Sequence, residues 1–170
     1  TNGTWEVPGD ATSNGTGPNS GFSGGANSYT NFESSGNSTA TANLISPAIN
    51  LAESTGEVEL SFYMHAFGPD MGTLDVGVGT NVAGPFTSVF AFSGQLQTAA
   101  GDPWAPIGVD LDTYAGQTIY VRFQQQGTGT GFTGDMAIDY VRVEICRALV
   151  TCAAPTAGVI SAITTSSAEL

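Results

Sequence analysis

The chain contains no lysine, and its only basic side chains are three arginines, Arg122, Arg142 and Arg147. Fifteen acidic residues oppose them, so the formal net charge of the 170-residue chain is -12. Proteins bind nucleic acids and anionic membrane surfaces mainly through clustered lysine and arginine. We therefore expect neither nucleic acid nor a membrane among the partners of this protein.

Cysteines and long apolar runs are also scarce. The two cysteines, Cys146 and Cys152, allow at most one local disulfide bond, and the sequence leaves open whether they are bridged. The core must therefore be stabilised by apolar packing. No run approaches the roughly 18 apolar residues of a membrane-spanning helix. Hydrophobic residues make up 41% of the chain and charged residues 11%, which indicates a soluble folded domain.

Glycine and proline are abundant, with 23 and 8 residues. Both break helices and supply the backbone angles of turns. Between them, strand-like runs recur at short spacing, over 58–66, 73–79, 86–92, 106–110, 118–126 and 136–145. Shorter strands fit around 5–7 and 28–33. This spacing predicts an all-β sandwich of two antiparallel sheets.

Alternation within these runs assigns side chains to faces, because successive residues of a strand point to opposite sides. The apolar sets predicted to face the core are Leu60, Phe62 and Met64, Leu74, Val76 and Val78, and Ile119, Val121 and Phe123. In the last strand, Asp139 shares parity with Ala137, Val141 and Val143. We therefore expect a carboxylate on the core side, where it needs a partner or a metal ion.

The order of motifs is similar to that of the MAM domain, a jelly-roll β-sandwich of extracellular multidomain proteins. The matching elements are Trp5, 16–18 (TGP), 29–33, 42–47 (ANLISP), 60–65 (LSFYMH), 72–76 (GTLDV), Trp104 and 134–139 (GDMAID). Two features depart from the family: most of its usual cysteines are absent, and 19–21 (NSG) replaces an expected aspartate after the TGP motif. The first departure fits a bacterial version of the domain.

The resemblance covers residues 1–146. Residues 147–170 begin as a linker and are similar to the start of a fibronectin type III domain, with a truncated first strand at the end. Such tandem arrangements imply export, so we expect a secreted protein with covalently linked neighbouring domains.

The resemblance also implies a structural calcium ion between the N-terminal segment and the last strand. Calcium takes 6–8 oxygen ligands. The residues at the matching positions are Glu6, Glu33, Asp135 and Asp139, with Asn19 as a substitute for the missing aspartate. The alternative is that Asp139 caps backbone amides or pairs with Arg142 or Arg147.

A mixed aromatic and polar surface is expected if strands 58–66, 73–79 and 118–126 share one sheet. Its members are Tyr63, His65, Asp75, Tyr120, Arg122 and Gln124. Aromatic rings stack on sugar rings, polar groups bind hydroxyls, and Arg122 is suited to clamp the carboxylate of a uronic acid. The alternative is a solvated face in which Arg122 pairs with Asp75. Trp104, which also fits the family's core tryptophan, and Phe132 are further candidate contacts.

Three catalytic motifs fail for lack of context. The 129–134 segment (GTGFTG) precedes a strand, not the helix of a dinucleotide site, and is expected to be a hairpin loop. The 21–25 segment (GFSGG) lacks the helix of a hydrolase elbow. Glu57 and Glu59 have the residue type of a glycosidase pair but lie at the polar start of a strand. We expect no enzyme activity.

The sequence thus predicts a non-catalytic carbohydrate-binding module of a secreted protein, with a structural calcium ion. Its partner would be a neutral or uronic-acid-containing polysaccharide. A protein–protein adhesion or oligomerisation domain is the alternative, and a structural spacer a further one.

Overall fold

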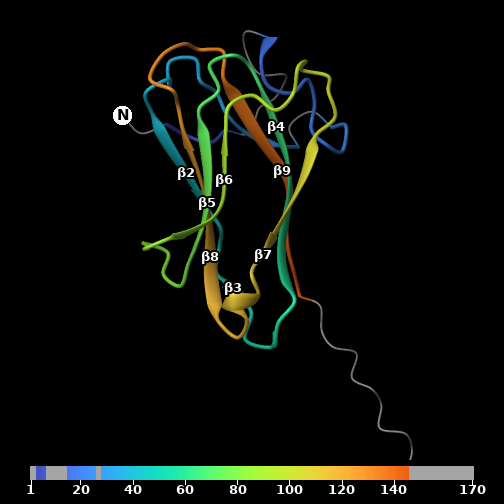
Figure 1. Ribbon diagram of the computed structural model, residues 1–170, viewed down its shortest axis with the longest axis vertical. Helices are drawn as coiled ribbons and strands as arrows, with labels where there is room; N and C mark the ends of the chain where they lie inside the picture. The colour runs from blue at the N-terminus through green and yellow to red at the C-terminus, as the bar shows by residue number, and fades with distance from the viewer. Residues whose placement is uncertain (1–2, 7–14, 26–27, 146–170) are drawn as a thin grey trace, which may run out of the picture.

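The computed structural model describes residues 3–6, 15–25 and 28–145 of the 170-residue chain. These residues form a sandwich of two antiparallel β-sheets (Figure 1). The strands are β1 (Thr30–Phe32), β2 (Thr41–Ile45), β3 (Ile49–Asn50), β4 (Val58–Phe67), β5 (Thr73–Gly79), β6 (Thr87–Ser93), β7 (Ala105–Asp110), β8 (Thr118–Gln126) and β9 (Asp135–Ile145). A short 3-10 helix, η2 (Asp112–Tyr114), follows β7.

One sheet has the strand order β1-β9-β4-β7, and we call it the β4 sheet. The other, the β8 sheet, has the order β2-β8-β5-β6, with β3 also paired to β8. Consecutive strands repeatedly cross from one sheet to the other, which gives the jelly-roll connectivity. The predicted all-β sandwich is therefore confirmed.

The predicted strand bounds agree closely with the structure. Runs 73–79 and 118–126 match β5 and β8, and the other four predicted runs differ from their strands by a residue at one or both ends. The 127–134 segment is a loop, as expected, but it connects β8 to β9 in the opposite sheet and is therefore not a hairpin.

The core lies between the two sheets. All nine side chains that the alternation assigned to it are buried: Leu60, Phe62, Met64, Leu74, Val76, Val78, Ile119, Val121 and Phe123. Phe62 packs edge-on against Phe123 and Phe90, with ring centroids 5.2 and 5.9 Å apart. This interlocking of rings from both sheets provides the apolar packing that the scarcity of cysteine requires.

A β-bulge in β9 overturns the predicted parity of Asp139. The β4 register runs from Ser61–Arg142 to Tyr63–Asp139, so that two residues of β9 oppose the single residue Phe62. Asp139 is thus cross-strand neighbour to Tyr63 on the outer face of the sheet, not on the core side. Regular alternation cannot reveal this, because one extra residue reverses the parity beyond it.

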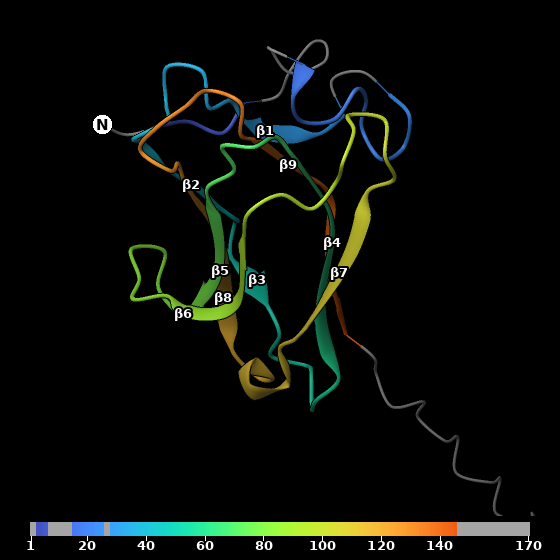
Figure 2. The ribbon, with the colours of Figure 1, turned by 45° about the horizontal axis from the view of Figure 1, so that its top comes forward.

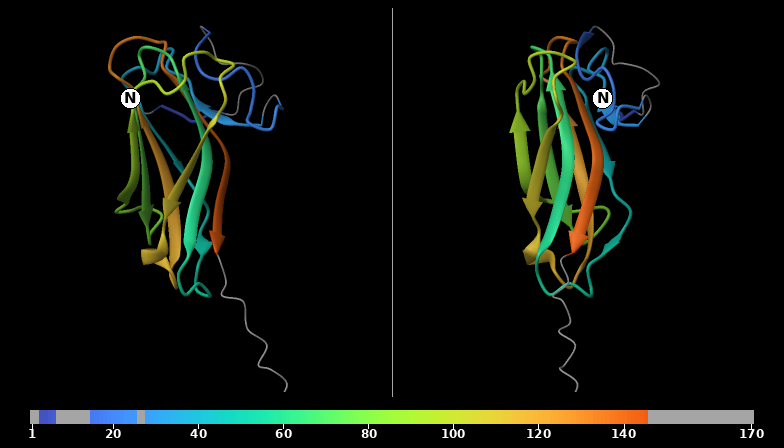
Figure 3. Two further views of the ribbon diagram at one scale, coloured as in Figure 1. Left: turned by 45° about the vertical axis from the view of Figure 1, so that its right-hand side comes forward. Right: turned by 90° about the vertical axis from the view of Figure 1, so that its right-hand side faces the viewer.

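The N-terminal segment lies over the upper end of the β4 sheet (Figures 2 and 3). Glu6 bridges Asn31, and the Gly17 amide donates to the Phe67 carbonyl. Cys146, Cys152 and the expected fibronectin type III-like segment lie outside the described residues. The described part of the chain contains no helix with the length and apolarity that crossing a membrane requires.

Candidate functional site

The six expected ligand-binding residues do not form one surface. Tyr63 and His65 are on β4, whereas Asp75, Tyr120, Arg122 and Gln124 are on β5 and β8 of the other sheet. The predicted surface required strands 58–66, 73–79 and 118–126 to share one sheet. They do not, so the prediction of a single surface is wrong. The two groups lie on opposite outer faces of the sandwich.

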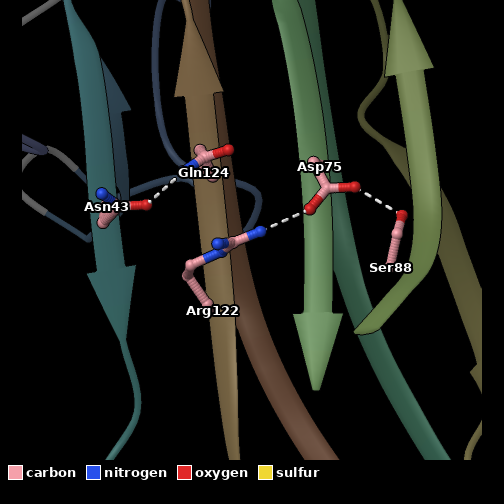
Figure 4. A network of polar contacts seen from close by, with 5 residues as sticks. All are labelled: Asn43, Asp75, Ser88, Arg122 and Gln124. Carbon is pink, nitrogen blue, oxygen red and sulfur yellow. Dashed lines mark hydrogen bonds and ion pairs between the residues drawn. The ribbon is translucent and has the colours of Figure 1, made fainter. Parts of the chain in front are cut away.

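The outer face of the β8 sheet carries a polar network across four neighbouring strands (Figure 4). Arg122 Nη2 lies 2.7 Å from Asp75 Oδ1, and Asp75 Oδ2 accepts a hydrogen bond from Ser88. On the same face, Gln124 Nε2 donates to Asn43 Oδ1 over 2.8 Å. We call this surface the polar face.

Arg122 is also covered from outside. Its guanidinium lies 4.9 Å from the centroid of the Phe86 ring, and its side chain is only 19% exposed. Gly77 makes this approach possible, since a Cβ there would crowd Phe86 and Arg122. The arrangement matches the alternative in which Arg122 pairs with Asp75, and it leaves the guanidinium engaged within the protein.

His65 lies on the outer face of β4 but is fully buried. Trp104 covers it, with ring centroids 5.6 Å apart, and Tyr29 packs edge-on against Trp104. Burial lowers the pKa of His65 to about 4, against a smaller opposing effect of Asp102. His65 is therefore a neutral packing residue at physiological pH. Trp104 packs on the outer face of the β4 sheet, and not in the core that lies between the two sheets.

Tyr63 instead belongs to a cluster of three aromatic rings, which we call the aromatic face. The Phe22 ring stacks on Tyr63 with centroids 3.5 Å apart, and Tyr140 lies 5.9 Å from Phe22 and 6.2 Å from Tyr63. Phe22 is 39% and Tyr140 47% exposed. The sequence prediction missed both, although an aromatic residue inside the glycine-rich 21–25 loop is itself an unusual feature.

Asp139 positions both exposed rings. Its Oδ2 accepts the Phe22 amide hydrogen over 2.9 Å, and its Oδ1 accepts the Tyr140 amide hydrogen over 2.6 Å. Gly21 makes this approach possible, because a Cβ there would overlap Ser28 Oγ and crowd Asp139. Asp139 therefore caps backbone amides, the second of the two roles considered for it.

The bulge also places Tyr140 in a left-handed backbone conformation, with φ of 55°. This region is unfavourable for any residue with a side chain, and such strain clusters at functional sites. The conformation turns the Tyr140 ring outward, beside Tyr63, without disturbing the core. The guanidinium of Arg142 lies 3.9 Å from the centroid of the Tyr140 ring.

Two hollows flank the exposed rings. One, of about 340 Å³, lies between Phe22 and Trp104 and includes Asn19 and Asp102. The other, of about 260 Å³, is lined by Tyr63, Pro106, Gly108, Tyr140, Arg142, Glu59 and Glu144, among others. Aromatic walls with a few polar groups are typical of small-ligand sites.

Of the five expected metal ligands, Glu33 and Asp135 meet. Asp135 is fully buried at the start of β9 and accepts hydrogen bonds from Thr16 Oγ1 (2.6 Å) and the Ser34 amide (2.9 Å). Burial, with a smaller contribution from the neighbouring Glu33 carboxyl, raises the pKa of Asp135 to about 6 against the opposing effect of these two donors. Two adjacent carboxyls beside the Thr16 hydroxyl form a group that a hard cation would stabilise.

The other three expected ligands lie elsewhere. Asp139 is four residues from Asp135 along β9, which separates them by roughly 13 Å at the rise of a strand. Glu6 and Asn19 are exposed. Within the described residues, no three side chains of His, Cys, Asp or Glu gather as a metal site.

A wide acidic hollow of about 610 Å³ lies at the lower end of the β4 sheet, and Glu57 and Glu59 line it with Asp110, Asp112 and Glu144. Asp112 Oδ1 accepts the Val58 amide hydrogen, and Asp110 Oδ1 accepts that of Asp112. The Asp112 carboxylate therefore fastens the β7–η2 turn to β4, and the Asp110 carboxylate stabilises the turn itself. Ser23, the serine of the GFSGG segment that was compared with a hydrolase elbow, lies in a turn of the 21–25 loop.

Comparison with known proteins agrees with this architecture. A family model described as "MAM domain, meprin/A5/mu" matches residues 1–147. The K1 cleaved adhesin domain of Lys-gingipain from Porphyromonas gingivalis is similar in structure, with a TM-score of 0.58 and 20% identity over 85% of each chain. The K2 cleaved adhesin domain of Lys-gingipain gives a TM-score of 0.53 and 19% identity, over 85% of this chain and 83% of that one. At these identities the likeness concerns the fold.

Proposed function

Since the chain belongs to the MAM domain family, we propose that it is a non-catalytic binding module of a secreted multidomain protein. We propose further that its ligand is a carbohydrate, bound on the aromatic face. The structural neighbours described as adhesin domains support a binding role outside the cell.

The observation that carries the proposal is the pair of exposed rings, Phe22 and Tyr140, held beside Tyr63 between two hollows. Aromatic rings stack on the apolar faces of sugars, and a ring that is already fixed loses little conformational entropy on binding. The capping of both backbone amides by Asp139 supplies this preorganisation.

The charges around the rings favour a neutral polysaccharide. Glu59 and Glu144 line the hollow beside Tyr63 and Tyr140, and Asp102 lines the hollow between Phe22 and Trp104. The nearby cation, Arg142, is 3.6 Å from Glu144 and so is partly balanced. An anionic sugar would meet like charge on both sides, whereas hydroxyl groups would find acceptors.

Affinity electrophoresis in gels containing neutral polysaccharides tests this function. We expect retardation by at least one polysaccharide, and Tyr140→Ala should weaken the affinity at least tenfold, about 1.4 kcal/mol. Tyr120→Ala makes the same change on the polar face and should leave binding intact. If the Tyr120 variant loses binding and the Tyr140 variant keeps it, the site is on the other sheet. If a broad glycan array gives no binding at all, the carbohydrate proposal fails.

We also propose that calcium binds at Glu33 and Asp135, with Thr16 as a neighbouring oxygen. The close approach of two carboxyls at a buried position supports this, because a divalent cation offsets their repulsion. Bound calcium would fasten the N-terminal segment to β9. EDTA should lower the melting temperature of the wild type and leave Asp135→Asn unchanged. An identical EDTA response in both, or none in either, would contradict the proposal.

A further inference from the structure

The lower half of β9 has an open edge. β1 pairs with β9 only at Met136–Ile138, whereas β4 pairs with the other side of β9 down to Ile145. Among the described residues, no strand therefore pairs with the outer edge of 141–145. Unpaired backbone donors and acceptors on such an edge are available to another strand.

An apolar groove of about 510 Å³ lies beside this edge, lined by residues of β9 and of the β2–β3 segment. Figure 3, right, shows these two parts of the chain side by side. The lining of the groove includes Leu44, Ile45, Ile49, Phe123, Val141 and Val143. Val141 is 45% exposed and Ile45 37%. The open backbone edge and the exposed apolar groove thus coincide, as they do where strand pairing is accompanied by side-chain packing.

The residues along this edge are arranged symmetrically. Arg142 and Glu144 lie on the outer face on either side of Val143, and they carry opposite charges. If a second β9 runs antiparallel with Val143 opposite Val143, each Arg142 faces the partner copy's Glu144. The same register places Val141 opposite Ile145. Opposite charges in directly facing positions stabilise an antiparallel pair.

We propose that a second copy of this chain pairs with the 141–145 edge about a two-fold axis at Val143. The two β4 sheets then join through their β9 strands, and the two apolar grooves face each other. Such an interface is isologous, since every contact occurs twice. The proposal does not rest on the carbohydrate function, because the strand edge and the apolar groove lie outside the aromatic face, although Arg142 and Glu144 also line the hollow beside Tyr140.

Two other edge strands of the sandwich, β7 and β6, are less suited to this pairing. β7 contains Pro106, which lacks an amide hydrogen, and β6 has a register irregularity opposite Val76–Gly77. Both features discourage edge-to-edge association. In contrast, the 141–145 segment contains no proline, glycine or lysine.

Five paired residues form a small interface, at the low end of those found between proteins. We therefore expect a weak dimer whose population rises with concentration. Sedimentation equilibrium from micromolar to millimolar protein should show this, and amide signals of 141–145 should shift on dilution. Val141→Asp should weaken the dimer at least tenfold. Val82→Asp is the matched control, because Val82 is 52% exposed in the β5–β6 loop.

Charge exchange tests the register itself. Arg142→Glu and Glu144→Arg each place like charges across the axis and should weaken the dimer at least fivefold, whereas the double exchange should restore it. A chain that stays monomeric at millimolar concentration overturns the proposal. So does a dimer that Val141→Asp leaves intact while the melting temperature shows a folded protein, or one in which the double exchange fails to restore association. Because Arg142 and Glu144 also line the hollow beside Tyr140, Val141→Asp is the variant that separates the two proposals: it should weaken the dimer and leave gel retardation by polysaccharide unchanged.

Discussion

The two outer faces of the sandwich use polar and aromatic side chains in opposite ways. On the polar face, the charged group Arg122 is paired with Asp75, covered by Phe86 and only 19% exposed. On the aromatic face, the carboxylate of Asp139 is used to hold two backbone amides, while the Phe22 and Tyr140 rings remain exposed. One face engages its charged groups with each other, and the other leaves part of its ring surface exposed.

This difference shows why residue type alone is a poor guide to a binding surface. Arginine and glutamine on a strand are frequent in ligand sites, yet here they complete contacts within the protein. On the aromatic face, the Arg142 guanidinium lies over the Tyr140 ring, yet Phe22 and Tyr140 stay 39% and 47% exposed. Availability after folding therefore distinguishes the faces, and substitutions on each should affect different properties.

The largest effect on stability is expected from Asp75→Ala on the polar face. Without this carboxylate, the half-covered Arg122 guanidinium loses its ion pair, and Ser88 loses its acceptor. We expect a loss of about 2 kcal/mol in the free energy of unfolding, less than for a fully buried pair because both side chains keep some solvent contact. Urea denaturation measures this. Ser88→Ala should cost less, and polysaccharide affinity should not change in either variant.

A smaller effect on stability, but a loss of binding, is expected at Tyr140. Glycine adopts a φ of 55° without the strain that a side chain imposes. Tyr140→Gly should therefore be more stable than Tyr140→Ala by about 1 kcal/mol, while both lose polysaccharide affinity. Denaturation midpoints and affinity gels compare the three proteins. Equal stability of the two variants would argue against backbone strain at the bulge.

The smallest effect is expected from the pH dependence of Asp135. Its pKa rises from 3.8 to about 6 on folding, so the folded state binds more protons than the unfolded state between these values. Its contribution to stability is therefore present below pH 4 and declines as the pH rises to about 6. Without calcium, Asp135→Asn should remove this decline. We expect the change of melting temperature between pH 4 and 7 to be smaller in Asp135→Asn than in the wild type. Parallel melting curves for both proteins would contradict the shift.

The sequence was sufficient for the core and for most strands, but it did not predict β2 or β3, and it did not predict the faces. Turn residues bracket β5 and β8 so clearly that their bounds were predicted, and alternation identified Phe62 and its neighbours as buried. Alternation says which side chains share a face of one strand, but it does not say which strands share a sheet. Alternation alone therefore assigns Tyr63 and Arg122 to one surface. The long-range pairing of the strands, which depends on the packing of the whole core, places them in different sheets.

The misassigned Asp139 has a second physical cause. One additional residue in β9 changes which side chains point outward. The local composition does not mark this bulge, because a tyrosine, unlike a glycine, does not indicate a left-handed backbone conformation. Phe22 was missed for a related reason. Its place against Tyr63 depends on the contact of the 21–25 loop with a strand more than a hundred residues later.

The bulge makes Tyr140 separable from the rest of the domain. Residues on either side of it, Ile138 and Val143, both pack inward, so removing Tyr140 would leave β9 with regular alternation and an unchanged inner surface. The aromatic contact on the outside of this strand is therefore carried by one residue that the inner surface does not need, and a shortened β9 that lacks it would keep its inward-facing side chains.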